Sequence, residues 1–104
     1  MKNEKLEITE SVKDGVCKLT ARGRIDSSNA DELKVKLEGA LEAGQKKIIL
    51  NMYNVKYLSS IGIRVILKVY KQASENGGVF NIERPSEVVK NVLGMLALKE
   101  LLVP

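Results

Sequence analysis

Apolar and polar residues alternate along the start of the chain, which predicts two strands joined by a tight turn. Leu6, Ile8 and Val12 alternate with charged or hydroxyl-bearing residues over positions 5–12, the period of a strand with one buried face. Asp14-Gly15 is typical of a hairpin turn, and the alternation resumes over residues 17–25. We therefore expect an antiparallel hairpin in which Cys17 is a buried core thiol rather than a reactive one.

The pattern then changes from a strand period to a helical one. Asp26-Ser27-Ser28-Asn29 offers several N-cap residues, apolar positions recur at helical spacing over residues 30–43, and Gly44 is a natural stop. Val35 lies outside this apolar arc and is either an ordinary surface residue or a contact for a partner. Residues 46–52 include Ile48-Ile49-Leu50, which is typical of a central strand buried on both faces.

The second half of the chain repeats the alternation of helix and strand. Residues 54–60 show no regular period, and a helix is expected to follow Ser60 and to end near Asn76, before Gly77-Gly78. Its core face is expected at Ile63, Ile66, Leu67 and Tyr70, widened by Val65, Val69 and Ala73. A strand over residues 79–83, a helix opened by Pro85-Ser86 and an apolar tail at 98–103 that docks on the fold complete the prediction.

This order of elements predicts one α/β domain that comprises residues 1–104. Strands that alternate with helices imply parallel pairing with right-handed crossovers, and the opening hairpin adds an antiparallel edge. The sheet is therefore expected to be mixed, with an N-terminal antiparallel hairpin and with the helices packed on it. A chain of 104 residues is too short for two independent cores.

The composition argues against most kinds of catalytic site. The chain has no histidine and one cysteine, which excludes a disulfide scaffold, a histidine-based metal site and any imidazole-dependent triad. Phosphate-binding glycine motifs and C-x-x-C are also missing from the sequence. We therefore expect neither an enzyme nor a metal or cofactor. With no long apolar run, a cytoplasmic protein without membrane insertion is expected.

The charge is modest but unevenly distributed. The net charge is +4, and no acidic residue falls between Glu42 and Glu75, where Arg64 and Lys68 lie on the exposed side of the second helix. This basic face is either simply solvated or a surface for an acidic partner. A small nucleic-acid-binding module is the less favoured alternative, because the four aromatic residues and the basic residues form no recognition motif.

Two loops are the candidates for function. In a parallel α/β sheet, functional residues gather at the carboxyl ends of strands, and there Asp26 and Ser59-Ser60 are expected to emerge at the same edge. Ser59 and Ser60 either cap the following helix or offer a hydroxyl for phosphorylation at its positive end. Asp26 either caps the first helix or contributes to this site.

Four segments together resemble a known family. They are Gly23-Arg24-Ile25-Asp26, then Ile48-Ile49-Leu50-Asn51, then the run from Tyr57 through Ser59-Ser60-Ile61-Gly62 to Val65, and Gly77-Gly78 before a strand. In this order and at these spacings they are similar to the STAS domain of anti-sigma factor antagonists. The resemblance extends over nearly the whole chain.

The resemblance implies a partner-switching role in transcription regulation. Such a domain binds an anti-sigma factor with serine-kinase activity and so releases a sigma factor; the kinase phosphorylates a serine of the domain, and a PP2C-type phosphatase reverses the modification. Alignment on Gly62 makes Ser60 the acceptor, with Ser59 at the family's aspartate position and as the alternative acceptor. The predicted partner surface comprises Asp26, Ser59, Ser60, Ile61 and Gly62, together with Arg64 and Lys68 of the basic face.

A second interpretation keeps the fold without the switch. Because Ser59 stands where the family has an aspartate, the chain could instead be a STAS scaffold that is never phosphorylated, or an accessory subunit associated with a transporter.

Overall fold

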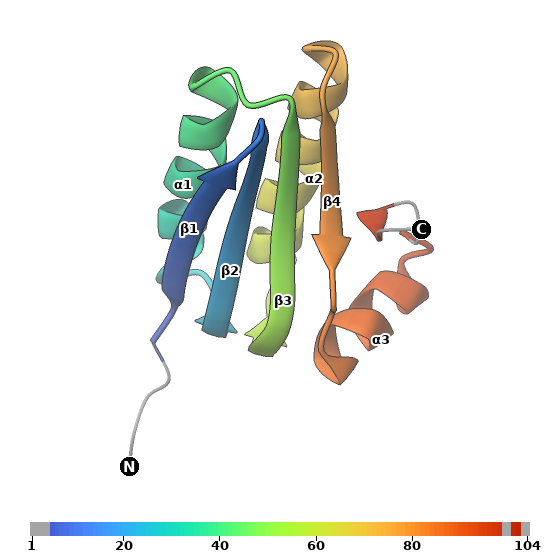
Figure 1. Cartoon of the computed structure of the whole chain (residues 1–104). Coiled ribbons are helices and arrows are strands. Elements are labelled where there is room, and N and C mark those ends of the chain that lie inside the picture. Colours follow the sequence, from blue (N-terminus) through green and yellow to red (C-terminus); the bar gives the residue numbers. More distant parts are fainter. Residues whose placement is uncertain (1–4, 99–100, 103–104) are drawn as a thin grey trace.

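Strands that are consecutive in the chain lie side by side in one sheet. The computed structural model describes residues 5–98 and 101–102, and the sheet order there is β1-β2-β3-β4. The first pair is antiparallel and the other two pairs are parallel, which confirms the predicted mixed sheet with an N-terminal hairpin. The elements are β1 (Glu7–Lys13), β2 (Val16–Ile25), α1 (Ala30–Glu42), β3 (Lys47–Leu58), α2 (Ser60–Glu75), β4 (Val79–Glu83) and α3 (Glu87–Met95) (Figure 1).

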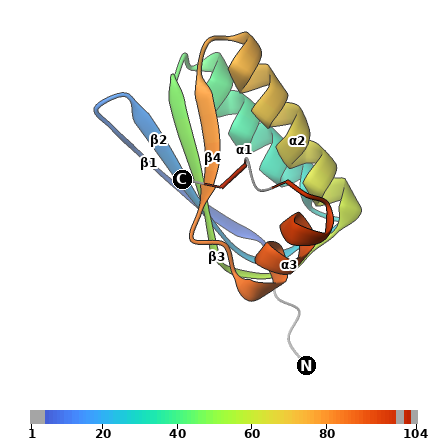
Figure 2. The same cartoon turned by 90° about the vertical axis from the view of Figure 1, so that its right-hand side faces the viewer.

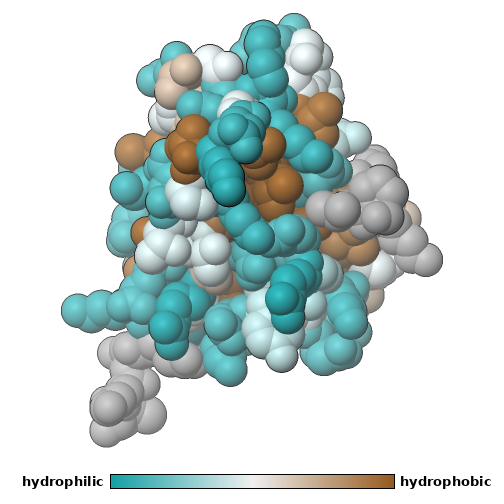
Figure 3. All heavy atoms as spheres, viewed as in Figure 1, coloured by the Kyte–Doolittle hydropathy of each residue, from teal (hydrophilic) through white to brown (hydrophobic). Residues whose placement is uncertain are grey.

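The helices cover one face of this sheet. Figure 2 shows α1 and α2 as a layer on one side of the strands, with α3 at the end where β3 finishes. The other face is open and mainly polar (Figure 3). Ile49 lies on this open face between Lys18 and Asn81 and is only half-buried, so the expected burial of this strand on both faces is wrong. No helix in the described ranges is both long enough and apolar enough to cross a lipid bilayer.

The core lies between the helical layer and the inner face of the sheet. Cys17 is fully buried there, and burial is the main cause that raises the pKa of its thiol, so the prediction of a core thiol is confirmed. The tail contributes as well: Leu101 is buried, and Leu102 forms a parallel bridge with Ile82. The expected docking is therefore confirmed for these residues, whereas positions 99, 100 and 103 lie outside the described part.

The segment expected to be irregular is part of β3. The register of β3 against β2 shifts twice, and at each shift β3 contains one extra residue. At the first shift, Thr20 pairs with Asn51 but Arg22 pairs with Asn54. At the second shift, Gly23 pairs with Val55 but Arg24 pairs with Tyr57. As a result the buried residues of this strand, Met52, Val55 and Leu58, are spaced by three instead of two. A strand with this spacing does not show the alternation of apolar and polar residues by which strands are recognised in a sequence.

Gly23, at the second of these register shifts, has a backbone conformation and a close contact that require glycine. Its φ is +101°, and a Cβ built on it would lie 2.0 Å from the backbone oxygen of Lys5. Only glycine tolerates both the positive φ and this close approach of the segment before β1.

The core face of α2 is rotated from the predicted one. Its buried residues are Gly62, Ile66, Val69 and Ala73, whereas Ile63, Leu67 and Tyr70 are only partly buried. The apolar arc of this helix is wide, because α2 packs against both α1 and β4. The sequence alone cannot choose the centre of so wide an arc.

Candidate functional site

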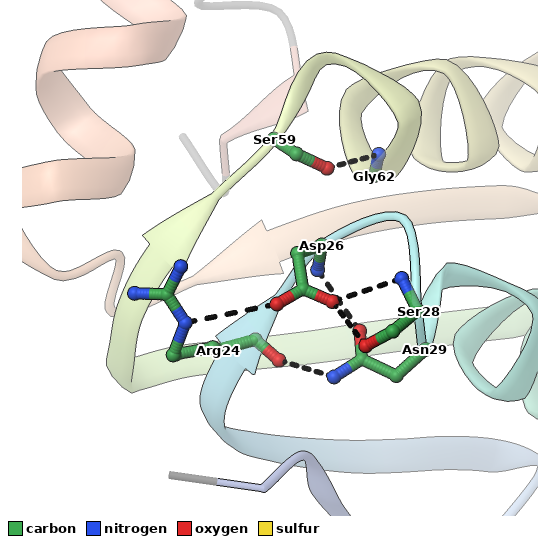
Figure 4. Close-up of polar contacts among 6 residues, drawn as sticks. All are labelled: Arg24, Asp26, Ser28, Asn29, Ser59 and Gly62. Carbon is green, nitrogen blue, oxygen red and sulfur yellow. Dashed lines mark hydrogen bonds and ion pairs between the residues drawn. The ribbon is translucent and has the colours of Figure 1, made fainter. Parts of the chain in front are cut away.

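A backbone hydrogen bond joins the loop after β2 to the loop after β3. The Ser59 N–H donates to the Ile25 carbonyl at 2.9 Å. The residue after Ile25 is Asp26 and the residue after Ser59 is Ser60, so both segments leave the same edge of the sheet. The expected proximity of these loops is confirmed, and Figure 4 shows them facing each other.

Asp26 is held within its own loop. One carboxylate oxygen, Oδ1, accepts from the Ser28 N–H at 3.0 Å and from the Ser28 hydroxyl at 2.6 Å, and the other, Oδ2, lies 3.6 Å from Nε of Arg24. The Ser28 hydrogen bonds are the main cause that holds the pKa of Asp26 below its ordinary value, and Arg24 adds a smaller effect in the same direction. Asp26 therefore carries a fixed negative charge at neutral pH.

The N-cap of the first helix falls within the predicted cluster Asp26-Ser27-Ser28-Asn29, but no side chain caps the helix. Its N-cap residue is Asn29, whose side chain makes no capping bond to the helix. Instead Oδ1 of Asn29 accepts from the Asp26 N–H at 2.9 Å, and its amide donates to the Arg24 carbonyl at 2.8 Å. The hypothesis that the Asp26 carboxylate caps this helix is wrong, because that carboxylate bonds to the preceding turn.

Arg24 and Tyr57 belong to the site but were not singled out from the sequence. The Arg24 guanidinium lies 4.3 Å from the centre of the Tyr57 ring, in a cation–π contact across paired strands. Arg24 thus links the end of β3 to the Asp26 carboxylate. The sequence shows that Arg24 lies two residues before Asp26. The contact of Arg24 with Tyr57, however, depends on a register shift between β2 and β3 that no local sequence pattern reveals.

The two serines differ in their contacts, so only one of them caps α2. Ser59 is the N-cap of α2, and its hydroxyl oxygen accepts from the Gly62 N–H at 3.2 Å. Ser60 is the first residue of the helix and is exposed, and within the described part of the chain its hydroxyl has no hydrogen-bond partner. Capping therefore falls to Ser59, and the Ser60 hydroxyl is left facing solvent.

We expect the Ser59→Ala variant to lose about 1 kcal/mol of unfolding free energy, because the Gly62 N–H loses its side-chain acceptor. Ser60→Ala is the matched control and is expected to change stability by less than about 0.5 kcal/mol, as an exposed substitution. Urea unfolding of both variants measures the difference. Equal midpoints for the two would contradict the assigned cap.

Gly62 and Ile61 define the surface around Ser60. A Cβ on Gly62 would meet Ile25 Cγ2 at 2.6 Å and Leu58 Cδ1 at 2.8 Å, so glycine lets the first turn of α2 pack closely on the ends of β2 and β3. Ile61 is 41% exposed although it is a large apolar residue. The site thus presents a hydroxyl and an apolar side chain beside a fixed carboxylate.

Arg64 and Lys68 lie further along α2 and are both exposed. Nζ of Lys68 is 4.0 Å from a Glu38 carboxylate oxygen on α1, so part of its charge is already compensated. Arg64 follows Ser60 by four residues and so lies on the same side of the helix. Of this pair, Arg64 is the one placed beside the loops.

The surroundings of the site suit recognition of a surface. A hollow of about 460 Å³ opens beside the Asp26 loop, and its charged lining consists of Lys5, Arg24, Asp26 and Glu32. In the described residues no three acidic or thiol side chains gather in a way that could hold a metal ion. Opposite charges, a free hydroxyl and exposed apolar groups are features with which a protein surface binds a partner.

Residues 7–103 match the family model of the STAS domain. The chain belongs to the STAS domain family. The STAS anti-sigma factor antagonist family is non-enzymatic and binds regulatory partners, which agrees with the expectation that this STAS domain is not an enzyme.

Proteins similar to this STAS domain carry a common description. BtrV of Bordetella bronchiseptica, provisionally named an anti-sigma factor antagonist, is 30% identical over 70% of this chain and 63% of its own length. The match thus spans less than two thirds of that relative. A Thermotoga maritima structure provisionally assigned the same role is 27% identical, with a TM-score of 0.84 over 91% of this chain and 82% of that one.

The anti-sigma factor antagonist SpoIIAA shares the fold. Its unphosphorylated form has a TM-score of 0.80 and 18% identity, and the match covers 95% of this chain and 86% of that one. SpoIIAA has also been solved in its phosphorylated form, with a TM-score of 0.75 and 17% identity over 95% of this chain and 89% of that one.

Proposed function

We propose that this STAS domain is an anti-sigma factor antagonist that binds an anti-sigma factor with serine-kinase activity and is switched by phosphorylation of Ser60. The observation that carries the proposal is the free, exposed Ser60 hydroxyl on the first turn of α2. Ser60 directly follows the Ser59 N–H that is hydrogen-bonded to Ile25, the residue before Asp26. The names of the similar proteins support the same role, and SpoIIAA is described in both phosphorylation states.

The proposed contact surface is built from the joined loops. It comprises Asp26, Ser59, Ser60, Ile61 and Gly62, with Arg64 and Lys68 at its margin. Ile61 supplies an apolar anchor near the centre, and Arg64 supplies a cation for an acidic patch on the partner.

Phosphorylation would oppose binding through electrostatics. A phosphoserine carries about −1.5 to −2 charges at neutral pH, and a dianion buried in an interface without cations is costly. Asp26, whose lowered pKa keeps it ionised, adds repulsion from the neighbouring loop. The same phosphate is compatible with the folded domain, because the N-terminus of α2 favours negative charge.

The remaining steps follow from this switch. The antagonist in its unphosphorylated form occupies the anti-sigma factor and releases a sigma factor for transcription, and a PP2C-type phosphatase restores that form. These events take place in the cytoplasm, where the transcription machinery works.

The experiment is a phosphosite map of the protein isolated from its own cells, with a phosphatase-treated sample as the control. We expect one removable phosphate on Ser60 and co-purification of an anti-sigma factor with the unphosphorylated form. A phosphate on Ser59 would move the acceptor by one residue and would remove the α2 cap. Well-covered peptides that stay unmodified across growth conditions would contradict the switch and favour the scaffold or the transporter-associated subunit. Salt-sensitive DNA binding would favour the nucleic-acid module.

A further inference from the structure

The free edge of β1 and the adjacent side of α1 form a second surface. It is built from other elements than the serine site, which comprises the loops after β2 and β3. β1 is the first strand in the sheet order and pairs with β2 alone within the described residues, so the backbone groups of its other edge are unpaired. A groove of about 400 Å³ runs between this strand and the helix, lined by Ile8, Asp31, Glu32, Val35 and Lys36. We call it the edge groove.

Three side chains of β1 point to the helical side of the sheet. Ile8, Glu10 and Val12 pair with Ala21, Leu19 and Cys17, which are all buried in the core, and paired residues share a face. The Cys17 thiol donates to Oε2 of Glu10 at 3.8 Å, which agrees with this direction.

α1 leaves Glu10 and Val12 uncovered, whereas Ile8 is partly buried against the core. Val12 is 52% exposed, Val35 on α1 is 63% exposed, and Glu10 is exposed as well. In Figure 2 the β1–β2 hairpin diverges from the helical layer towards its turn, in agreement with the exposure of Glu10 and Val12. The face therefore shows the pattern apolar, acidic, apolar beside an apolar residue of α1.

The charges indicate what could cover this surface. Asp31 and Glu32 outnumber Lys36 in the lining of the edge groove, so the groove is acidic beside the apolar residues Ile8 and Val35. Glu10, exposed on the adjoining strand, adds a further negative charge next to it. An extended segment with a lysine or arginine between two apolar residues of one face complements it. Its backbone would form hydrogen bonds with the unpaired N–H and C=O groups of β1 and so add a fifth strand to the sheet.

A second copy of β1 is a poor occupant. In an antiparallel pair about a two-fold axis, Ile8 lies opposite Val12 only in the register that sets Glu10 opposite Glu10. Like charges directly opposite destabilise a strand pair, and the registers shifted by two residues in either direction place Glu10 against Ile8 or Val12.

We propose that the β1 edge and the edge groove bind an extended segment of another protein that carries a basic residue flanked by apolar residues on one face. Glu10 pairs with the basic residue, and the apolar residues pack against Ile8, Val12 and Val35. The serine site takes no part in this contact.

The test is an amide chemical-shift titration of the ¹⁵N-labelled full chain with two capped seven-residue peptides, TVTKTVT and TVTETVT. We expect shifts in Glu7–Lys13 and Val35, and affinity for the lysine peptide about fivefold higher, as for one opposite-charge pair. Glu10→Lys is expected to invert this preference. Thr9→Lys, one residue away on the opposite face, is the matched control and is expected to keep it.

Four results would overturn the proposal. In the titration they are equal affinity of the wild-type chain for both peptides, shifts that lie outside β1 and α1, and no shift at millimolar peptide; a fourth comes from a separate measurement. A wild-type dimer that protects β1 in sedimentation and hydrogen exchange would also overturn it, since the occupant would then be a second copy. Val35→Asp provides an independent check, because this exposed substitution is expected to weaken both peptides and to leave the fold intact.

Discussion

Replacing Gly23 by alanine is expected to lower the free energy of unfolding by about 3 kcal/mol or more, because backbone strain and a steric clash combine. The new Cβ would lie 2.0 Å from the Lys5 carbonyl oxygen, which is backbone and cannot rotate away, and φ at this position is +101°. The chain before β1 would have to detach or β2 would have to change its twist. Urea unfolding followed by circular dichroism measures the loss.

Gly39→Ala is the matched control for that variant. Gly39 lies in α1, is exposed, and has no neighbour within 4 Å of a built Cβ. The helix is expected to gain about 0.5–1 kcal/mol from this change, since alanine is the better helix former. Loss of stability of similar size in both variants would contradict the special role of Gly23.

Ser60→Asp is expected to weaken binding to the co-purifying anti-sigma factor about a hundredfold, equivalent to about 2.7 kcal/mol. The carboxylate places a negative charge on the first turn of α2 inside the proposed interface, beside the ionised Asp26. The folded domain is expected to be unchanged or slightly more stable, because an acidic residue at a helix N-terminus is favourable. Isothermal titration calorimetry gives the affinity, and urea unfolding gives the stability.

Two variants make this result specific. Ser60→Ala is expected to bind within a few-fold of the wild type, and Ser74→Asp sets the same charge at the far, exposed end of α2 and is expected to bind normally. If Ser60→Asp binds as tightly as Ser60→Ala, a negative charge at this position does not control the complex.

The periodic parts of the sequence predicted the architecture well. The hairpin turn at Asp14-Gly15 was recognisable because both residues adopt positive φ, which this pair of residue types favours. The meeting of the Asp26 and Ser59 loops followed from parallel pairing alone. Rules that depend on local period and on sheet topology were therefore sufficient for the fold and for the location of the site.

The details that escaped prediction depend on contacts between distant segments. The end of β3 shows no regular period in the sequence because two register shifts space Met52, Val55 and Leu58 by three. The Arg24–Tyr57 contact depends on the same shifts. Ser59 and Ser60 were equivalent as caps until the start of α2 was fixed by its packing on Ile25 and Leu58.

The sheet order, which follows the order of the chain, has a consequence for synthesis on the ribosome. Each strand pairs with the strand made just before it, so the nascent chain can extend the sheet one strand at a time without waiting for a distant segment. Both loops of the serine site are present once α2 has emerged, before β4 and α3 are translated. β4, α3 and the docked tail then close the side of the core that the nascent chain still exposes.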